Sequence, residues 1–372
     1  MAKKNPHMQG NMIEPLPVAK NKSVKDFIDN VFGASGYNAR RLHEACDIYS
    51  RMIGADASIA LTLAGAMTPI GMSGPFIELI KKGFVDFFIS TGANCYHDLH
   101  RAFNLPVTQG RFDADDGELN EHGVARIYDT YIGDDETLLP TDRIIREVCE
   151  QTEWSGPVST ATLHNIIGKA VLEKAPCPEK SFVAAAAKYG VPIFCPSPGD
   201  SSIGMNFVVS RMFGGGPAID PILDIIESTA IVRAAKKNGV IILGGGAPKN
   251  FYMQTQPTLW QILFDNHGGH DYFIQLTTDT PQWGGLSGAT PQEAKSWGKV
   301  RDPQVNTTVV YSCSSITFPL ITRYALDTCK ARKPRRLMDA LPALVQDMKT
   351  SGGGNPEFKK AYGRMLKRLG QA

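Results

Sequence analysis

Paired cysteines are missing from this sequence of 372 residues. It has seven cysteines, an odd number, and none of them forms a Cys-x-x-Cys pair. This pattern argues against a disulfide framework and against a structural zinc site with Cys-x-x-Cys ligands. The sequence therefore predicts a protein of a reducing compartment, the cytoplasm, without a structural metal.

An excess of charge and a long apolar run are missing as well. The 39 basic and 37 acidic residues leave a formal net charge of +2, which creates no field that would attract a nucleic acid or an anionic membrane. The longest apolar run, near residues 59–67, is far shorter than the roughly 20 residues of a spanning helix. We therefore expect a soluble protein that acts on a small molecule, with no nucleic-acid or membrane partner.

Short β-rich runs alternate with helical patterns along most of the chain. The apolar positions from Leu42 to Ile53 have helical spacing, and a second helix is expected after Asp220-Pro221. The β-rich runs lie at residues 84–90, 191–195, 239–243, 272–276 and 308–312. This alternation of strands and helices predicts a Rossmann-like α/β fold with a doubly wound, mostly parallel sheet and helices on both of its faces. We expect one large domain, residues 25–372. Residues 1–24 lack periodicity, so we expect a flexible arm there.

The GxGxxG fingerprint of dinucleotide-binding proteins is also absent. Three glycines, 244–246, nevertheless follow the predicted strand 239–243, where a backbone without side chains lets a dinucleotide approach closely. Small hydroxyl residues follow two other strands, at 90–94 and 312–315, as expected of groups that hydrogen-bond a ribose or an amide. The alternatives are a tight turn for the glycines and ordinary helix N-capping for the hydroxyls.

The most specific chemistry lies in one predicted helix and the turn after it. Thr290 is a candidate N-cap, Pro291 the first helical residue and Glu293 the partner that completes a capping box. Glu293 and Trp297 are four residues apart and share a helix face, which suits an alkylammonium chain. Beside this aromatic wall Lys299 would lose solvation, and its free amine could attack a carbon to form a Schiff base. The alternatives are a purely structural Glu293 and a solvated surface lysine.

Two pairs of histidines have the three-residue spacing of helical metal ligands. They are His97 with His100 and His267 with His270. Neither pair has evident third and fourth ligands, and exposed or capping histidines are commoner than ligands. The sequence therefore favours no metal site.

From Glu293 to Lys299 the sequence reads Glu-Ala-Lys-Ser-Trp-Gly-Lys. It resembles deoxyhypusine synthase, whose nucleophilic lysine ends a Ser-Trp-Gly-Lys motif preceded by a glutamate at this spacing. The likeness covers nearly the whole chain after the arm. The matching segments before the motif are residues 85–91, 118–127, 191–200 and 239–246, and Phe318-Pro319 matches after it. It implies a Rossmann-like NAD fold and a homotetramer with active sites at dimer interfaces, in which the N-terminal segment can plug a neighbour's site.

The resemblance also implies a mechanism. NAD takes a hydride from spermidine, diaminopropane leaves, Lys299 holds the aminobutyl fragment as an imine, an acceptor amine displaces it, and the retained NADH reduces the product imine. The catalytic residue is then Lys299, and the implied substrate contacts are Glu293, Trp297, Gly284, Gly285 and Asn250. The implied NAD contacts are Thr68, Thr91, Gly92, Ala93, His97, Asp200, Gly245, Thr278, Asp279, Cys313 and Ser314.

Four positions depart from the family's pattern, namely Met205, Asn250, Leu286 and His97. The first three stand where the family's polyamine site has an aspartate, a histidine and a further aspartate, and the fourth replaces a glutamate near the cofactor. A desolvated polycation needs a partner for each ammonium, so these losses should weaken or shift spermidine binding. We therefore favour transfer to a small amine, with a product such as homospermidine. The alternatives are a deoxyhypusine synthase that modifies a lysine of a translation initiation factor, an NAD-dependent amine dehydrogenase and a non-catalytic NAD-binding subunit.

Overall fold

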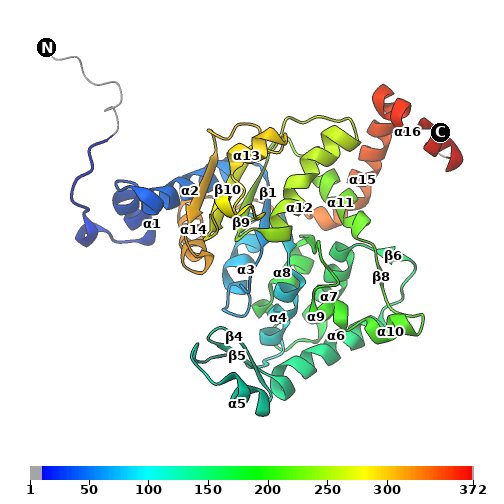
Figure 1. Ribbon diagram of the computed structural model, residues 1–372, viewed down its shortest axis with the longest axis horizontal. Helices are drawn as coiled ribbons and strands as arrows, with labels where there is room; N and C mark the ends of the chain where they lie inside the picture. The colour runs from blue at the N-terminus through cyan, green and yellow to red at the C-terminus, as the bar shows by residue number, and fades with distance from the viewer. Residues whose placement is uncertain (1–10, 371–372) are drawn as a thin grey trace.

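Six strands form the central sheet of the computed structural model, which describes residues 11–370 (Figure 1). Their order across the sheet is β11-β10-β9-β1-β2-β7, and each neighbouring pair is parallel. The strands are β1 (Ser58–Leu63), β2 (Phe87–Ser90), β7 (Ile193–Phe194), β9 (Asn238–Leu243), β10 (Tyr272–Thr277) and β11 (Thr307–Tyr311). The predicted α/β class with a parallel sheet is confirmed.

Strand β1 lies in the interior of the sheet, between β9 and β2, and the sequence pattern did not predict it. All six of its residues are buried, and they face hydrophobic clusters on both sides of the sheet. A strand covered on both faces has no alternation of polar and apolar residues, so its run of residues looks merely hydrophobic. The predicted strand 191–195 is shorter than expected, since Pro192 has no N–H to donate to the sheet.

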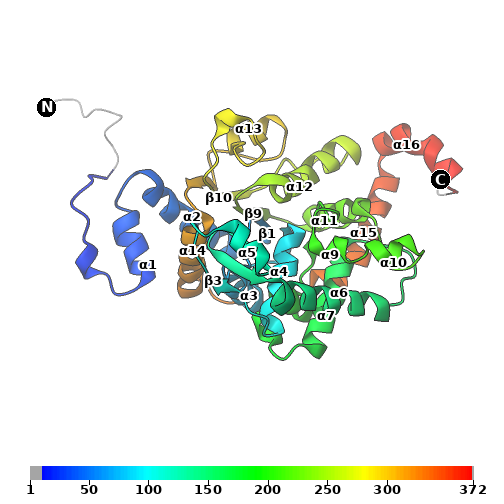
Figure 2. The same cartoon turned by 60° about the horizontal axis from the view of Figure 1, so that its bottom comes forward.

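Helices cover both faces of the sheet, as predicted, and each face has its own hydrophobic cluster (Figures 1 and 2). Along β1, Ile59 and Leu61 belong to one cluster and Ala60 to the other. The first cluster includes α2 (Tyr37–Gly54), α3 (Ser73–Lys81), α7 (Thr160–Lys174), α8 (Phe182–Tyr189) and α14 (Ser314–Thr328). The second includes α11 (Pro221–Ala234), α12 (Gly246–Pro257) and α15 (Leu337–Gly354). The molecule is therefore a three-layer, doubly wound α/β structure.

Both helices predicted from apolar spacing are present. The apolar positions of the pattern from Leu42 to Ile53 are all buried in α2. The second helix, α11, begins at Pro221, and the side chain of Asp220 caps it by accepting a hydrogen bond from the Ile222 N–H at 2.9 Å. Ile222, in the first turn of this helix, is 58% exposed.

The remaining elements lie around this core. The helices are α1 (Val24–Phe27), α4 (Gly92–Ala102), α5 (Asp116–Glu121), α6 (Leu139–Gln151), α9 (Ser202–Met205), α10 (Val208–Met212), α13 (Pro291–Ser296) and α16 (Pro356–Arg368). Strands β3 (Thr108–Gln109), β4 (Val124–Ile127) and β5 (Thr130–Gly133) form an antiparallel sheet, and β6 (Pro157–Val158) pairs with β8 (Ala218–Ile219). Of the predicted arm, residues 11–20 are exposed, while residues 1–10 lie outside the described part of the chain. Within residues 11–370 no helix combines the length and the hydropathy needed to cross a membrane.

The strand order reverses direction at the pair of β1 and β9. From β1 the chain passes outward to β2 and β7, and it then returns to β9 before passing outward on the other side to β10 and β11. In doubly wound sheets the crevice at such a switch point, beyond the carboxyl ends of the strands, is where ligands bind. Most of the predicted cofactor contacts directly follow the carboxyl ends of these strands.

Candidate active site

Helix α13 begins as the sequence predicts. The Thr290 side chain accepts a hydrogen bond from the Glu293 N–H at 3.1 Å, and Pro291 is the first helical residue. The reciprocal half of the capping box is not formed, because the Glu293 carboxylate has no hydrogen bond or ion pair with any residue from 11 to 370. The carboxylate is therefore left available to a ligand.

A cavity of about 290 Å³ lies between α12 and α13. It brings together four of the predicted site residues, Lys299, Glu293, Trp297 and Asn250. Its other lining residues are Lys249, Met253, Gln254, Leu286, Ala289 and Ala294. The predicted substrate contacts Gly284 and Gly285 do not line it; they lie in the exposed loop that leads to Leu286.

Lys299 is half-buried in this cavity. Its Nζ lies 5.4 Å from the centre of the Trp297 ring and donates a hydrogen bond to Asn250 Oδ1 at 3.4 Å. Burial lowers the pKa of Lys299, and the nearby Glu293 carboxylate partly offsets this effect. A lysine with a lowered pKa supplies the neutral amine that attacks a carbon to form an imine.

Lys249 is a second lysine of the cavity, and the sequence pattern did not predict it. It is 4% exposed, and its Nζ donates to Gln275 Oε1 at 2.9 Å and to the carbonyl oxygen of Ala289 at 2.6 Å. Burial lowers its pKa to about 8, with Glu293 opposing the shift. The ammonium group thus anchors the loop before α13 to strand β10. A single lysine early in a helix gives no sequence signal that separates this buried role from a surface one.

The carboxyl end of β2 places three predicted cofactor contacts at the start of α4. Thr91 is the N-cap residue, and Gly92 and Ala93 form the first turn. Asn94 links this turn to the loop after β1, because its side chain donates to Thr91 Oγ1 at 2.9 Å and accepts from the Thr68 N–H at 3.1 Å. Thr68 is fully buried, and its hydroxyl donates to the Asn94 carbonyl oxygen at 2.8 Å. Its side chain therefore supports the loop and does not face an open site.

The other strand ends carry the remaining predicted cofactor contacts. Gly245 follows β9, and a Cβ at this position would lie 2.4 Å from Ser287 Cα, so only glycine fits. The exposed or half-buried side chains are Asp200 after β7, Thr278 and Asp279 after β10, and Cys313 after β11. Ser314 is buried, and its hydroxyl donates to the Leu276 carbonyl oxygen at 3.1 Å. Like the Thr68 hydroxyl, the Ser314 hydroxyl therefore stabilises the backbone at the strand ends.

A second cavity, of about 350 Å³, adjoins the first. The two share Asn250, Gln254 and Leu286, and the second reaches Pro196 beyond the end of β7. The two cavities therefore continue from Lys299 along α12 and α11 towards the end of β7. The predicted cofactor contacts at the strand ends lie outside the lining of both. The close approach of backbone at Gly245 and the polar residues at the strand ends fit an extended dinucleotide.

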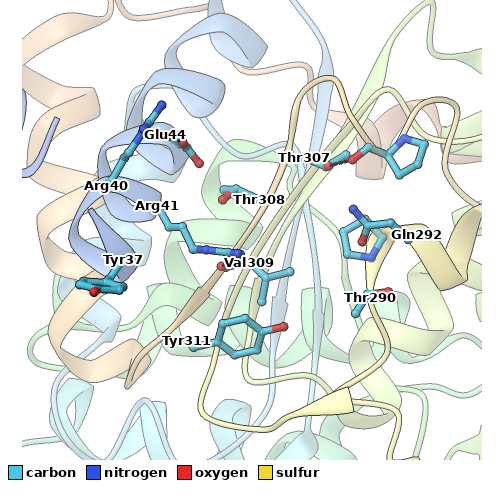
Figure 3. Close-up of a pocket in the computed structure, with 12 residues that line it drawn as sticks. Tyr37, Arg40, Arg41, Glu44, Thr290, Gln292, Thr307, Thr308, Val309 and Tyr311 are labelled. Carbon is cyan, nitrogen blue, oxygen red and sulfur yellow. Dashed lines mark hydrogen bonds and ion pairs between the residues drawn. The ribbon is translucent and has the colours of Figure 1, made fainter. Parts of the chain in front are cut away.

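A further cavity lies elsewhere and contains none of the predicted site residues (Figure 3). It has a volume of about 530 Å³ and lies between the first turns of α2, the edge strand β11 and the start of α13. Arg41 donates to the Val309 carbonyl oxygen at 3.0 Å, and Asn38 accepts from the Tyr311 N–H at 3.1 Å. These contacts cover backbone groups of an edge strand that could otherwise pair with another chain, so we assign this region to the protection of the sheet edge.

Comparison with known proteins gives a consistent result. The family profile for deoxyhypusine synthase matches residues 27–325. The "Deoxyhypusine synthase-like protein" of Nostoc punctiforme is 41% identical over 350 residues, which cover 91% of this chain and 89% of that protein. The "Probable deoxyhypusine synthase 2" of Methanosarcina acetivorans is 37% identical over 314 residues, or 84% of this chain and 88% of its own. The fold matches the crystal structure of an Entamoeba histolytica protein assigned as a deoxyhypusine synthase, with a TM-score of 0.60 and 16% identity over 86% of this chain and 99% of that one.

Proposed function

The chain belongs to the deoxyhypusine synthase family and is a transferase of the aminobutyl-transfer type, and we propose that it uses NAD to move an aminobutyl group from a polyamine to a small amine. The observation that carries this proposal is the cavity in which Lys299, with its lowered pKa, lies beside Trp297 and Glu293. Lys299 provides an amine that can form an imine, Trp297 an aromatic surface for an alkyl chain, and Glu293 a carboxylate for an ammonium group.

Three side chains of the cavity then have defined tasks. When bound, NAD supplies the hydride acceptor of the first step and the hydride donor of the last. The Lys299 amine attacks the oxidised donor carbon, diaminopropane leaves, and the aminobutyl fragment stays on Nζ as an imine. Trp297 covers this imine from one side, and Glu293 pairs an ammonium of the substrate. The acceptor amine then displaces Nζ, so that Lys299 returns to its free form.

Residues at the strand ends would hold the cofactor. Gly245 lets the backbone approach it closely, and Thr91, Gly92 and Ala93 offer the first turn of α4. Asp200, Thr278, Asp279 and Cys313 lie at the neighbouring strand ends with side chains at least partly exposed. We expect Thr68 and Ser314 to act indirectly, by fixing the loops that carry these groups.

The charges of the cavity limit how it can bind a polyamine. Within the described residues, Glu293 is the single carboxylate that lines it, against the two lysines Lys249 and Lys299. Asn250 and Leu286, two of the departures from the family's pattern, line it as well, whereas Met205 does not. A cavity with one carboxylate can pair one ammonium, and a desolvated second or third ammonium would be costly. Because this site differs from the family's acidic polyamine site at Asn250 and Leu286, we propose transfer to a small amine, with a product such as homospermidine and a lysine of a translation factor as the second candidate acceptor.

Mass spectrometry of reaction products tests this proposal. The purified protein is incubated with NAD, spermidine and each of several acceptors, namely putrescine, other diamines, agmatine and a translation initiation factor. We expect an acceptor heavier by one aminobutyl unit, release of diaminopropane and no accumulation of NADH. Steady release of NADH without transfer would instead identify an amine dehydrogenase. Transfer to the protein acceptor alone would contradict the small-amine assignment.

We also propose that the protein is a homotetramer with the N-terminal arm near a neighbouring site. An apolar surface on α9 and α10 supports subunit contact, since Met205, Val208, Val209, Met212 and Phe213 are each more than half exposed. We expect light scattering to give four times the 40.5 kDa chain mass. Removal of residues 1–20 should leave the fold intact, because residues 11–20 bury no side chain. Ser23 and Val24 are kept in this variant, since Ser23 caps α1 and Val24 packs against the first hydrophobic cluster. A monomer in solution would contradict the proposal.

A further inference from the structure

The second cavity of the site, between α11 and α12, is lined by uncharged residues. Its apolar lining residues are Pro196, Ile225, Ala247, Phe251 and Leu286. Its polar lining residues carry hydroxyl or amide groups, and they are Ser228, Thr229, Asn250, Gln254, Thr255 and Thr258. Among residues 11–370, no acidic or basic side chain lines this cavity, whereas Glu293, Lys249 and Lys299 line the first one. A ligand in the second cavity therefore meets no side chain that could pair with a charge.

One hydroxyl of this cavity has no hydrogen-bond partner. Thr229 is fully buried in α11, and its Oγ1 forms no hydrogen bond with any residue from 11 to 370. The other three hydroxyls belong to Ser228, Thr255 and Thr258, and they donate to nearby backbone carbonyl oxygens at 3.3, 2.7 and 2.9 Å. A buried polar group without a partner destabilises the folded protein. The Thr229 hydroxyl is therefore available to a polar group of a ligand.

The second cavity begins where the reaction takes place. It shares Asn250 with the first cavity, and Asn250 Oδ1 accepts the hydrogen bond from Lys299 Nζ. In the proposed transfer the acceptor nitrogen replaces Nζ on the imine carbon and Nζ leaves as the free amine, so the acceptor chain extends from Lys299 into the space beside it. None of the predicted cofactor contacts, His97 on α4 included, lines either cavity. The acceptor chain and the cofactor therefore do not compete for this space.

We infer that the second cavity binds the chain of the acceptor amine, and that this chain is uncharged beyond the reacting nitrogen, as in an amino alcohol. The inference rests on the proposed function and narrows its acceptor class. The methylene groups pack against Ile225 and Phe251, and the terminal hydroxyl forms a hydrogen bond with Thr229. A second ammonium in this cavity would lose its hydration without gaining a carboxylate, a cost that an alcohol does not carry. Putrescine, the acceptor that gives homospermidine, should therefore react more slowly than an amino alcohol of the same length.

Kinetics with three acceptors of equal length test this inference. 4-Aminobutan-1-ol, pentylamine and putrescine differ only in the last heavy atom, which carries a hydroxyl, a methyl or an ammonium group. With NAD and spermidine, we expect kcat/KM for each uncharged-chain amine to exceed that for putrescine by about tenfold or more. Equal or faster reaction of putrescine would overturn the inference and leave the proposed function intact. If no amine gained an aminobutyl unit, the proposed function would fall as well.

Two variants test the contacts. Thr229→Val removes an unpaired buried hydroxyl, so the fold should be retained, and kcat/KM for 4-aminobutan-1-ol relative to pentylamine should fall by about three- to tenfold, as for the loss of one hydrogen bond. Thr322→Val is the matched control, because the Thr322 hydroxyl in α14 is also buried without a partner among residues 11–370 but lines neither cavity; it should leave this ratio unchanged. Gln254→Glu places a carboxylate where the two cavities meet, and it should raise kcat/KM for putrescine relative to 4-aminobutan-1-ol by about fivefold. An unchanged ratio in either Thr229→Val or Gln254→Glu would overturn the inference.

Discussion

Replacement of Lys299 by arginine is expected to lower turnover by about 1,000-fold or more, because a guanidinium cannot be deprotonated to attack a carbon. Arginine keeps the positive charge beside Glu293 and Trp297, so NAD binding and folding should be retained. The measurement is steady-state formation of transferred product, with NAD affinity from calorimetry alongside.

Lys295→Arg is the matched control for this variant. Lys295 is an exposed lysine of α13, the helix that precedes Lys299, and its Nζ donates to the Arg301 carbonyl oxygen at 2.7 Å, away from the cavity. It should keep wild-type turnover. Full activity in Lys299→Arg would show that the chemistry does not pass through Lys299.

Replacement of Glu293 by glutamine has the second largest expected effect. Glutamine keeps the size and removes the charge that would pair a substrate ammonium, so kcat/KM should fall by about tenfold or more. The free energy of unfolding should change by about 1 kcal/mol or less, since Thr290 caps the helix through the Glu293 N–H, which is retained. Steady-state kinetics and urea denaturation measure the two quantities.

Glu357→Gln controls for the loss of a carboxylate at a helix start. Glu357 lies in the first turn of α16, and its N–H donates to the Asn355 side chain at 2.9 Å, far along the chain from the cavity. This variant should leave kcat/KM unchanged. If Glu293→Gln also left it unchanged, Glu293 would have only a structural role, as in the alternative that the sequence left open.

The fold and the core of the site were accessible from the sequence because their signals are local. Thr290 and Pro291 define the start of α13 through neighbouring residues, and the spacing of Glu293 and Trp297 follows from helix geometry. That a ligand binds beyond the carboxyl ends of the strands follows from the doubly wound α/β class. These features need no knowledge of distant contacts.

What the sequence could not give depends on contacts between distant residues. The burial of Lys249 comes from Gln275 and Ala289, which lie 26 and 40 residues away in the chain. The hydroxyl of Ser314 looks like a ligand contact in the sequence, yet in the structure it is bound to the carbonyl oxygen of Leu276 on a neighbouring strand. Strand β1 was missed because burial on both faces removes the alternation that marks a strand.

The presence of two lysines in one cavity makes the assignment of the imine the central question. Borohydride added during turnover with NAD and spermidine reduces an imine to a stable secondary amine, and peptide mapping then locates it. We predict an adduct heavier by one aminobutyl unit on Lys299, none on Lys249 and none in Lys299→Arg. An adduct on Lys249, or product formation without any adduct, would contradict the account.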